Sequence, residues 1–475
     1  MARINTNVAA LTAQRGLAKS QRSLSDTLQR LSSGLRINRG ADDPAGLIAS
    51  EGLRSEISGI TQAINNSQRA SNVISTAEAA LGEVANLLLN IKELVVQAAN
   101  TGALSPDEIA ANQLQVDSAV ESITRISNTT TFAGLHLING SLDYVTSGVA
   151  TSAVKALQVT QANFGQNASI PVQIDVLTSA RTADLFYRAS AITQSVTLEI
   201  GGREGVEVLT FTSGTKSSAI AFAINRISDA TGVTAALANN ATAASGIVLQ
   251  SGEYGSKAYV SVTAQTGIFG TVDTQSNSKT RVVGQDNVST VNGSLTVGDG
   301  LNVRVNTSTL DLEFSLDSAF GVGATSFSIT GGGALFQLGP KVSSNQQVNL
   351  GISSAAASKL GDSVTGFLND IVTGGRSTLV SGNSQDASQI VEKAIRQVAV
   401  LRGRLGAFEK NTLNTNINSL SVALENVTAS ESSIRDADFA EETSALTRAQ
   451  ILTQAGTSVL ATANSSPQSI LSLLQ

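Results

Sequence analysis

The stretch from Asp42 to Gly102 reads DDPAGLIASEGLRSEISGITQAINNSQRASNVISTAEAALGEVANLLLNIKELVVQAANTG and decides the fold. Asp43 can cap a helix, and Pro44 suits the first helical position because its missing N–H costs nothing there. Apolar residues then recur at coiled-coil spacing, with two serines as small members of the seam. The seam contains Ile57, Ile60, Ile64, Ser67, Ser71, Ile74, Leu81, Leu88, Ile91 and Val95. The stretch predicts a helix of roughly fifty residues, about 75 Å long.

An amphipathic helix precedes this long helix. Leucines repeat upstream at helical intervals. They are Leu17, Leu24, Leu28, Leu31 and Leu35. Gly34 and Gly40 then interrupt the pattern. We therefore expect a hinge at Gly40, followed by the cap that Asp43 and Pro44 form.

Further helices follow the long one. The segment from Ser105 to Glu108 is a capping box that begins a third helix, which should run to about Ser127. Towards the other end, apolar residues keep a rhythm of three and four from Val391 to Phe408 and resume it at Leu413 after one stutter. The last helical stretch carries Ile451, Leu452, Val459 and Leu460. No charged side chain occurs from Ala449 to Gln475, so this last stretch should seek burial.

The centre of the chain has a different period. Residues 196–200 and 310–316 alternate apolar and polar side chains, which indicates strands, while Gly, Asn and Asp supply turns. One short helix, with Ile220 and Ile224 on its apolar face, should end at Gly232. We predict a mainly α fold in which long coiled-coil-like helices from both chain ends form a rod, with a central α+β or all-β insert.

These patterns divide the chain into five parts. The first and last are terminal helices, the second and fourth are the two halves of a helical rod domain, and the third is the strand-rich insert. We expect a β-hairpin at the start of the fourth part. The expected parts are residues 1–43, 44–180, 181–325, 326–430 and 431–475.

The two chain ends complement each other in charge. Residues 1–44 hold seven basic and three acidic residues, for a net charge of +4, whereas residues 430–475 hold two basic and five acidic residues, for −3. Each end also has an apolar stripe that stabilises the protein only when buried. A ribbon of paired ends still exposes apolar surface, so packing among many identical chains completes the burial, and a contact that does not close generates a helical filament. A monomeric helical bundle with a β insert is the alternative.

Both chain ends resemble bacterial flagellin. At the first end the resemblance lies in residues 10–17 (ALTAQRGL), 31–38 (LSSGLRIN) and 42–46 (DDPAG). At the other end it lies in residues 425–438 (ENVTASESSIRDAD), 450–456 (QILTQAG) and 463–468 (ANSSPQ). Residues 334–350 are also similar to the β-hairpin of that family. The resemblance covers roughly residues 1–140 and 385–475.

The resemblance implies a structural subunit that assembles with itself into the flagellar filament for swimming. Its termini would form an inner tube, with the insert projecting outward. It further implies extracellular localisation, export by the flagellar type III pathway without a cleaved signal peptide, an export chaperone, and hook-associated and cap proteins as partners. The subunit contacts are expected at the five N-terminal leucines and at Ile451, Leu452, Val459 and Leu460.

A patch in the long helix matches the stretch that a Toll-like innate immune receptor reads in this family. The matching residues are Leu89, Asn90, Ile91, Lys92, Glu93 and Leu94. Asn90 stands where the family pattern has its first Arg. We expect weak receptor activation, because an amide cannot supply the guanidinium fork of arginine.

The composition excludes most chemical functions. The chain has no Cys and a single His, His136, so disulfides, zinc sites with several His ligands and the two-histidine zinc protease motif are excluded. The net charge of −6 argues against a nucleic-acid binder, and no apolar run is long enough for membrane insertion. We expect no catalytic residue, no cofactor and no metal. Two alternatives to the filament subunit are a hook-filament junction or cap protein and a surface adhesin that acts through the insert.

Overall fold

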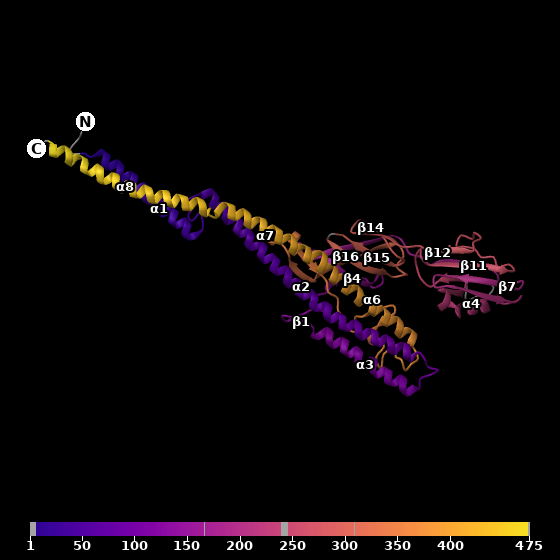
Figure 1. Cartoon of the computed structure of the whole chain (residues 1–475). Coiled ribbons are helices and arrows are strands. Elements are labelled where there is room, and N and C mark those ends of the chain that lie inside the picture. The colour runs from indigo at the N-terminus through magenta and orange to yellow at the C-terminus, as the bar shows by residue number, and fades with distance from the viewer. Residues whose placement is uncertain (1–5, 166, 239–245, 308, 474–475) are drawn as a thin grey trace. The chain divides into compact units, whose positions relative to one another are not determined.

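The computed structural model describes residues 6–165, 167–238, 246–307 and 309–473. They belong to two compact units (Figure 1). The first unit contains residues 1–69, 337–342 and 410–475, and the second contains residues 70–336 and 343–409. The expected terminal segments 1–43 and 431–475 both fall in the first unit, although their outermost residues 1–5 and 474–475 lie outside the described ranges.

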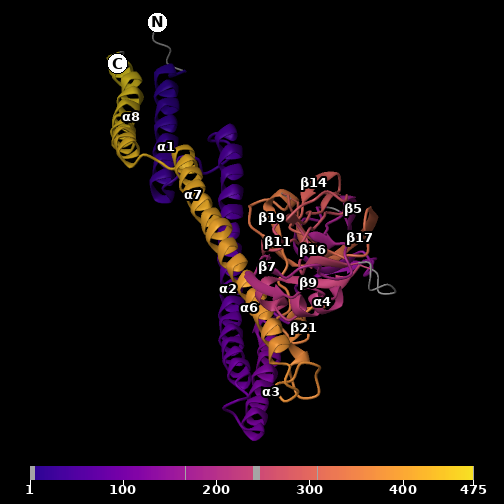
Figure 2. The same ribbon diagram turned by 90° about the vertical axis from the view of Figure 1, so that its right-hand side faces the viewer.

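The first unit is helical. Helix α1 (Val8–Ser33) lies beside α8 (Phe439–Leu473) in both views of the chain (Figures 1 and 2), and α7 (Asn414–Arg435) precedes α8. Asn7 caps α1, and Gly34 ends it with φ of 73°, a left-handed conformation that glycine adopts without strain. The predicted interruption at Gly34 is confirmed. Helix α2 (Pro44–Ala98) begins in this unit and confirms the long helix after Pro44.

The helices of the second unit bury the apolar residues that recur along them. They are the later part of α2, α3 (Pro106–Thr129) and α6 (Ser384–Phe408). The predicted capping box is present, because the Ser105 hydroxyl accepts from the Glu108 N–H and the Glu108 carboxylate accepts from the Ser105 N–H. Buried seam residues are Ile74, Leu81, Leu88, Ile91, Val95, Val116, Val120, Ile123, Ile390, Val391, Ala394, Val398, Leu401 and Leu405. A π-helical turn, Glu409–Leu413, occupies the predicted stutter.

Two strand regions, each with its own buried core, complete the second unit. The first strand region has a five-stranded sheet of order β14-β13-β5-β17-β3 and a three-stranded sheet of order β15-β16-β4. Its strands are β3 (Tyr144–Ser147), β4 (Val154–Ala162), β5 (Ile170–Thr178), β13 (Val288–Val291), β14 (Ser294–Val297), β15 (Asn302–Asn306), β16 (Leu310–Leu316) and β17 (Gly323–Gly332). The predicted alternation in β16 is confirmed, because Leu310, Leu312 and Phe314 are buried.

The second strand region combines a four-stranded sheet of order β12-β11-β7-β8, a three-stranded sheet of order β6-β10-β9 and two short helices. Its strands are β6 (Asp184–Tyr187), β7 (Val196–Gly201), β8 (Val206–Phe211), β9 (Val233–Leu237), β10 (Ile247–Ser251), β11 (Tyr259–Thr266) and β12 (Arg281–Val283). Helix α4 (Ser217–Asn225) buries Ile220 and Ile224 as predicted, but it ends at Asn225, and a separate short helix, α5 (Ser228–Thr231), is the one that ends at Gly232.

Short strand pairs connect these regions to the helices. They are β1 (Thr131–Phe132) with β2 (Leu135–His136), β18 (Ala334–Gln337) with β19 (Gln347–Leu350), and β20 (Gly361–Asp362) with β21 (Gly366–Phe367). The pair of β18 and β19 confirms the expected hairpin.

The strand-rich part of the chain is larger than the sequence predicted. The first strand region begins at Tyr144, inside the segment 44–180 that we expected to be helical, and β17 continues past residue 325 to Gly332. The physical reason is pairing, because β5 lies between β13 and β17 in one sheet. A boundary at residue 181 would separate β5 from both of its partners. The helical part before the insert ends at Thr129 instead.

Candidate self-association surface

The two ends of the chain pair along α1 and α8. The Asn7 side-chain amide donates to the Ala463 carbonyl at 2.7 Å, and the Arg30 guanidinium contacts the Glu442 carboxylate at 3.2 Å. Between these polar contacts, Leu17 packs so closely on Gly456 that a Cβ there would lie 3.2 Å from Leu17 Cδ1. The contact of Arg30 with Glu442 matches the opposite net charges of the two ends.

The linkers between the helices are also joined. Leu35 and Asp436 form an antiparallel β-bridge, in which the Arg36 N–H donates to the Arg435 carbonyl at 2.7 Å. The Arg36 guanidinium donates to the Ile434 carbonyl at 2.6 Å. The segment that follows α1 is thus hydrogen-bonded to the segment in which α7 ends and α8 begins.

A tight cap begins α2 beside this bridge. Asp43 accepts from the Gly46 N–H at 2.9 Å, and Pro44 occupies the first helical position. A Cβ on Gly46 would overlap Asp43 Oδ2 and Cδ1 of the buried Ile37, so any larger residue would force these two side chains to shift. By contrast, a Cβ on Gly40 would meet only Leu47 Cδ2, at an ordinary 3.5 Å. Close packing thus concentrates at Gly46, which the sequence did not single out.

Asp42 organises the turn that precedes the cap. Its carboxylate accepts from the backbone N–H groups of Asn38 at 3.0 Å and Arg39 at 2.8 Å. These hydrogen bonds, above all the one from Arg39, lower the pKa of Asp42 below its usual value because they favour the charged form. The turn is therefore held by an ionised carboxylate.

The predicted contact residues divide into two groups. One group is half-buried in the single chain and consists of Leu17, Leu24, Leu31, Leu35 and Leu460. The other group stays largely exposed and consists of Leu28, Ile451, Leu452 and Val459. Ile451 keeps 63% of its surface exposed and Val459 keeps 57%. The pairing of α1 with α8 thus buries only part of the predicted stripe.

Several exposed apolar side chains of the first unit lie outside the predicted contact set, and two of them are Ile48 and Phe439. Ile48 on α2 is 76% exposed and Phe439 at the start of α8 is 67% exposed. Ile48 falls outside the seam spacing of α2, and an apolar residue off the seam is the signal that would have revealed it. Both residues extend the exposed apolar surface beyond the predicted set.

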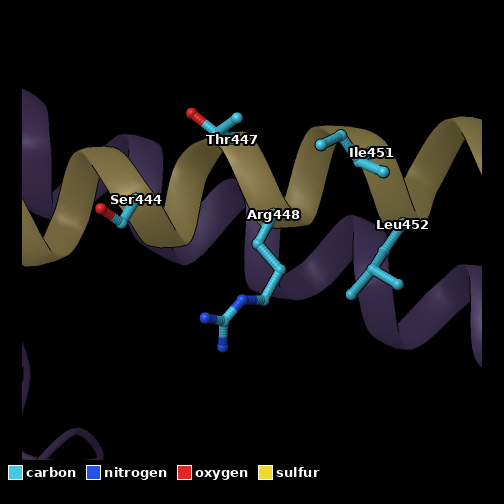
Figure 3. Close-up of a pocket in the computed structure, with 5 residues that line it drawn as sticks. All are labelled: Ser444, Thr447, Arg448, Ile451 and Leu452. Atoms are coloured by element: carbon cyan, nitrogen blue, oxygen red, sulfur yellow. The ribbon is translucent and has the colours of Figure 1, made fainter.

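A hollow on α8 lies within this surface (Figure 3). Its lining comes from the one helix and consists of Ser444, Thr447, Arg448, Ile451 and Leu452. Thr447 and Ile451 lie on one side of the helix in this view, and Arg448 and Leu452 lie on the other. Side chains that spread around one helix suit contact with a broad protein surface rather than a small molecule, which needs a concave site.

The part of the chain that the structure describes has neither a cluster of metal-binding side chains nor a membrane-spanning helix. Within residues 6–165, 167–238, 246–307 and 309–473, no group of three or more His, Asp and Glu side chains could hold a metal ion. His136 is exposed in β2. Over the same ranges, none of the helices is long and apolar enough to span a bilayer.

The receptor-like patch lies on α2 in the second unit. Asn90 and Glu93 are exposed, whereas Lys92 and Leu94 are half-buried. The Lys92 ammonium contacts the Glu392 carboxylate of α6 at 3.2 Å. The cation that matches the second Arg of the family pattern is thus already paired within the chain.

Comparisons with known proteins agree with this architecture. Models described as the bacterial flagellin N-terminal and C-terminal helical regions match residues 4–143 and 388–474. A B-type flagellin of Pseudomonas aeruginosa is 31% identical and a flagellin of Salmonella rubislaw is 29% identical, each alignment covering 99% of both chains. Among solved structures, flagellar hook associated protein-3 from Legionella pneumophila is 12% identical with a TM-score of 0.31, covering 80% of this chain and 97% of that one. A TM-score this low carries no functional argument.

Proposed function

Because this chain belongs to the bacterial flagellin family, we propose that exposed apolar side chains of α1, α8 and the start of α2 bind neighbouring copies in the flagellar filament. The chain is a structural subunit of that filament and not an enzyme. The proposal concerns which residues make the subunit contacts. They are Leu28, Ile451, Leu452 and Val459 of the predicted set, together with Ile48 and Phe439.

The exposure of these side chains supports the proposal. Burying a large aliphatic side chain contributes about 1.5–3 kcal/mol relative to leaving it in water. Ile451 and Val459 keep more than half of their surface exposed, although no charged side chain occurs after Arg448. The described part of the first unit leaves this apolar surface in solvent. In a filament of identical subunits, a neighbouring copy is the partner that can bury it.

The exposed apolar surface of the terminal helices also supports an assembly mechanism. A helix pair with little buried surface orders weakly on its own, since ordering each residue costs about 1–2 kcal/mol of backbone entropy. Apolar contacts with neighbouring subunits would offset that entropy at the growing filament tip. We therefore expect the terminal helices to order fully only in the filament.

The layered arrangement of the subunit is part of the proposal. We assign residues 1–43 and 431–475 to the inner tube and the flanking helical segments to the layer around it. The strand regions from Tyr144 to Gly332 would then project outward. The ranges matched by the two flagellin models support this assignment, because they cover the helical ends and leave most of the strands unmatched.

Other partners follow from membership of the family. We propose that the chain leaves the cell through the flagellar type III pathway, with a chaperone covering the uncharged stretch after Arg448, and that it meets hook-associated and cap proteins in the flagellum. We also propose weak activation of a Toll-like receptor through Asn90, Lys92, Glu93 and Leu94. Asn90 is the reason to expect weak activation, because the matching family residue is arginine and an amide lacks the guanidinium group.

A double substitution in the full chain tests the subunit contacts. The double variant Ile451→Ser with Val459→Ser should keep a free energy of unfolding, measured on the monomer by thermal unfolding, within about 0.5 kcal/mol of the parent. Both side chains are exposed. Growth from filament seeds, followed by light scattering and negative-stain microscopy, should be lost. Thr457→Ser on the same helix is the matched control and should assemble normally. Filaments of normal length from the double variant would refute the assignment.

A further inference from the structure

The four-stranded sheet of the second strand region has one open face. Leu198, Ile200, Val260 and Val262 point into the core of that region. Because side chains alternate along a strand, their neighbours in sequence point to the opposite face. On that face Val206 is 55% exposed, Val208 is 50% exposed and Val283 is 54% exposed. The open face therefore presents apolar side chains on both of its outer strands, β8 and β12.

The strand register places these side chains across the sheet from one another. Val206 is opposite Gly201, Gly201 is opposite Ser261, and Ser261 is opposite Arg281, so one row crosses all four strands. In the next row Tyr259 is opposite Val283. The middle of the first row has the smallest side chains, which leaves the two outer strands as its prominent parts.

The two sides of the open face carry opposite charges. Glu199 of β7 is on this face beside Val208, whereas Glu207 is opposite the buried Ile200 and so belongs to the other face. On β12, Arg281 is exposed and lies over the Tyr259 ring at 4.2 Å from its centroid. One side of the face is thus apolar and acidic, and the other side is apolar and basic.

We propose that this sheet face is a second self-association surface, in which β8 of one subunit contacts β12 of a neighbouring copy. Val206 and Val208 would meet Val283, and Glu199 would lie near Arg281 of the next copy. Two unlike patches can bind head to tail from copy to copy, and such a contact builds a helical filament when its rotation does not close into a ring. The proposal rests on the chain's being a filament subunit, but not on the α1 and α8 contacts.

The cysteine-free sequence allows a direct test. In the full chain, Val206→Cys with Val283→Cys should form disulfide-linked oligomers in oxidised filaments, visible as a ladder on non-reducing gels. A disulfide within one chain is excluded, because three strand spacings of about 4.8 Å separate β8 from β12 and a disulfide needs Cα atoms within about 7 Å. The matched control replaces Val206 with Cys in combination with Phe222→Cys, at an exposed position of α4. Filaments of the test pair with no more ladder than this control would overturn the proposal.

Charge reversal provides a second readout that does not need cysteine. Glu199→Lys and Arg281→Glu should each lower the temperature at which filaments dissociate, and the two together should restore it. Equal dissociation temperatures for all four proteins would also overturn the proposal. Failure here is distinguishable from failure of the terminal contacts, because these variants should still nucleate and elongate filaments, whereas Ile451→Ser with Val459→Ser should not.

Discussion

Arg30 of α1 and Glu442 of α8 form an ion pair at 3.2 Å across 412 positions of sequence. The Glu442 side chain is 10% exposed and the Arg30 side chain is 36% exposed, so the pair is partly shielded from water. It lies on the same helix pair as the contact of Leu17 with Gly456 and the hydrogen bond from Asn7 to Ala463. Together these contacts set the alignment of α1 with α8, and that alignment decides which apolar side chains remain exposed.

Removing the shielded charge should weaken this helix pair. Glu442→Gln should lower the free energy of unfolding of the first unit by about 1–2 kcal/mol, because Arg30 loses a partly buried partner. Exchange of backbone amides in α1 and α8, measured by hydrogen–deuterium exchange, should speed up. The control is Glu441→Gln at the exposed neighbouring position. Equal exchange in the two variants would mean that the ion pair does not hold the helices together.

Two glycines of α2 should respond in opposite ways to alanine. Gly46→Ala should destabilise the protein, because the new Cβ would overlap Asp43 and Ile37 and overpacking typically costs 1–3 kcal/mol. Gly52→Ala should stabilise it by about 0.5–1 kcal/mol, since nothing lies within 4 Å of that position and alanine favours a helix interior. Thermal unfolding measures both effects. A stabilised Gly46→Ala variant would contradict the close packing at the cap.

The helices could be predicted from sequence because their signals are local. Pro44 at a first helical position, the capping box from Ser105 to Glu108 and the left-handed Gly34 each act within one turn of helix. The repeat of apolar residues then gave the buried seam. The stutter after Phe408 likewise coincides with the π-helical turn.

The limits of the strand regions could not be predicted because they depend on distant pairing. β5 is placed by β13 and β17, more than a hundred positions away, and no local pattern names those partners. Which apolar side chains stay exposed could not be predicted either, and for a similar reason. Helical periodicity marked Leu24 and Ile451 alike as contact residues, but only the alignment of α1 with α8 half-buries the first and leaves the second exposed.

Tyr144 should make the first strand region sensitive to alkali. Its hydroxyl donates to the Asn349 carbonyl at 3.0 Å and accepts from the Ala162 N–H at 2.8 Å, and burial raises the pKa of Tyr144 to about 12. The folded state therefore favours the protonated phenol. The stability this contributes is complete below pH 10, the ordinary pKa, and is lost as the pH rises towards 12.

The variant Tyr144→Phe separates the two effects of this hydroxyl. At pH 7 it should cost about 1–3 kcal/mol, because the Ala162 N–H is left buried without its partner. Between pH 10 and 12 its stability should fall less steeply than that of the parent. Urea unfolding at several pH values measures both quantities. Parallel curves for the two proteins would show that Tyr144 does not cause the alkaline loss.

Restoring arginine in the receptor-like patch should strengthen the receptor response. Asn90 is exposed, so Asn90→Arg should leave the fold unchanged while supplying the guanidinium that the amide lacks. A reporter-cell assay with dissociated subunits should show a rise of about tenfold, as expected for one charge-assisted contact of roughly 1.4 kcal/mol. Gln97→Arg, on the same helix outside the patch, should have no effect. Full potency of the parent protein would contradict this reading of Asn90.

Acid should open the turn before α2 at a pH that Asp42 sets. The N–H groups of Arg39 and Asn38 hold the pKa of Asp42 below its usual value, so the ionised form is favoured in the folded state. The stability this provides is present above the ordinary Asp pKa of about 3.9 and is lost as the pH falls through the lower, folded value. Amide exchange at Asn38 and Arg39, followed by NMR at decreasing pH and corrected for intrinsic rates, should therefore accelerate only below that ordinary value. Asp42→Asn should abolish this acid dependence, and a transition near pH 6 in the parent would assign the opening to another group.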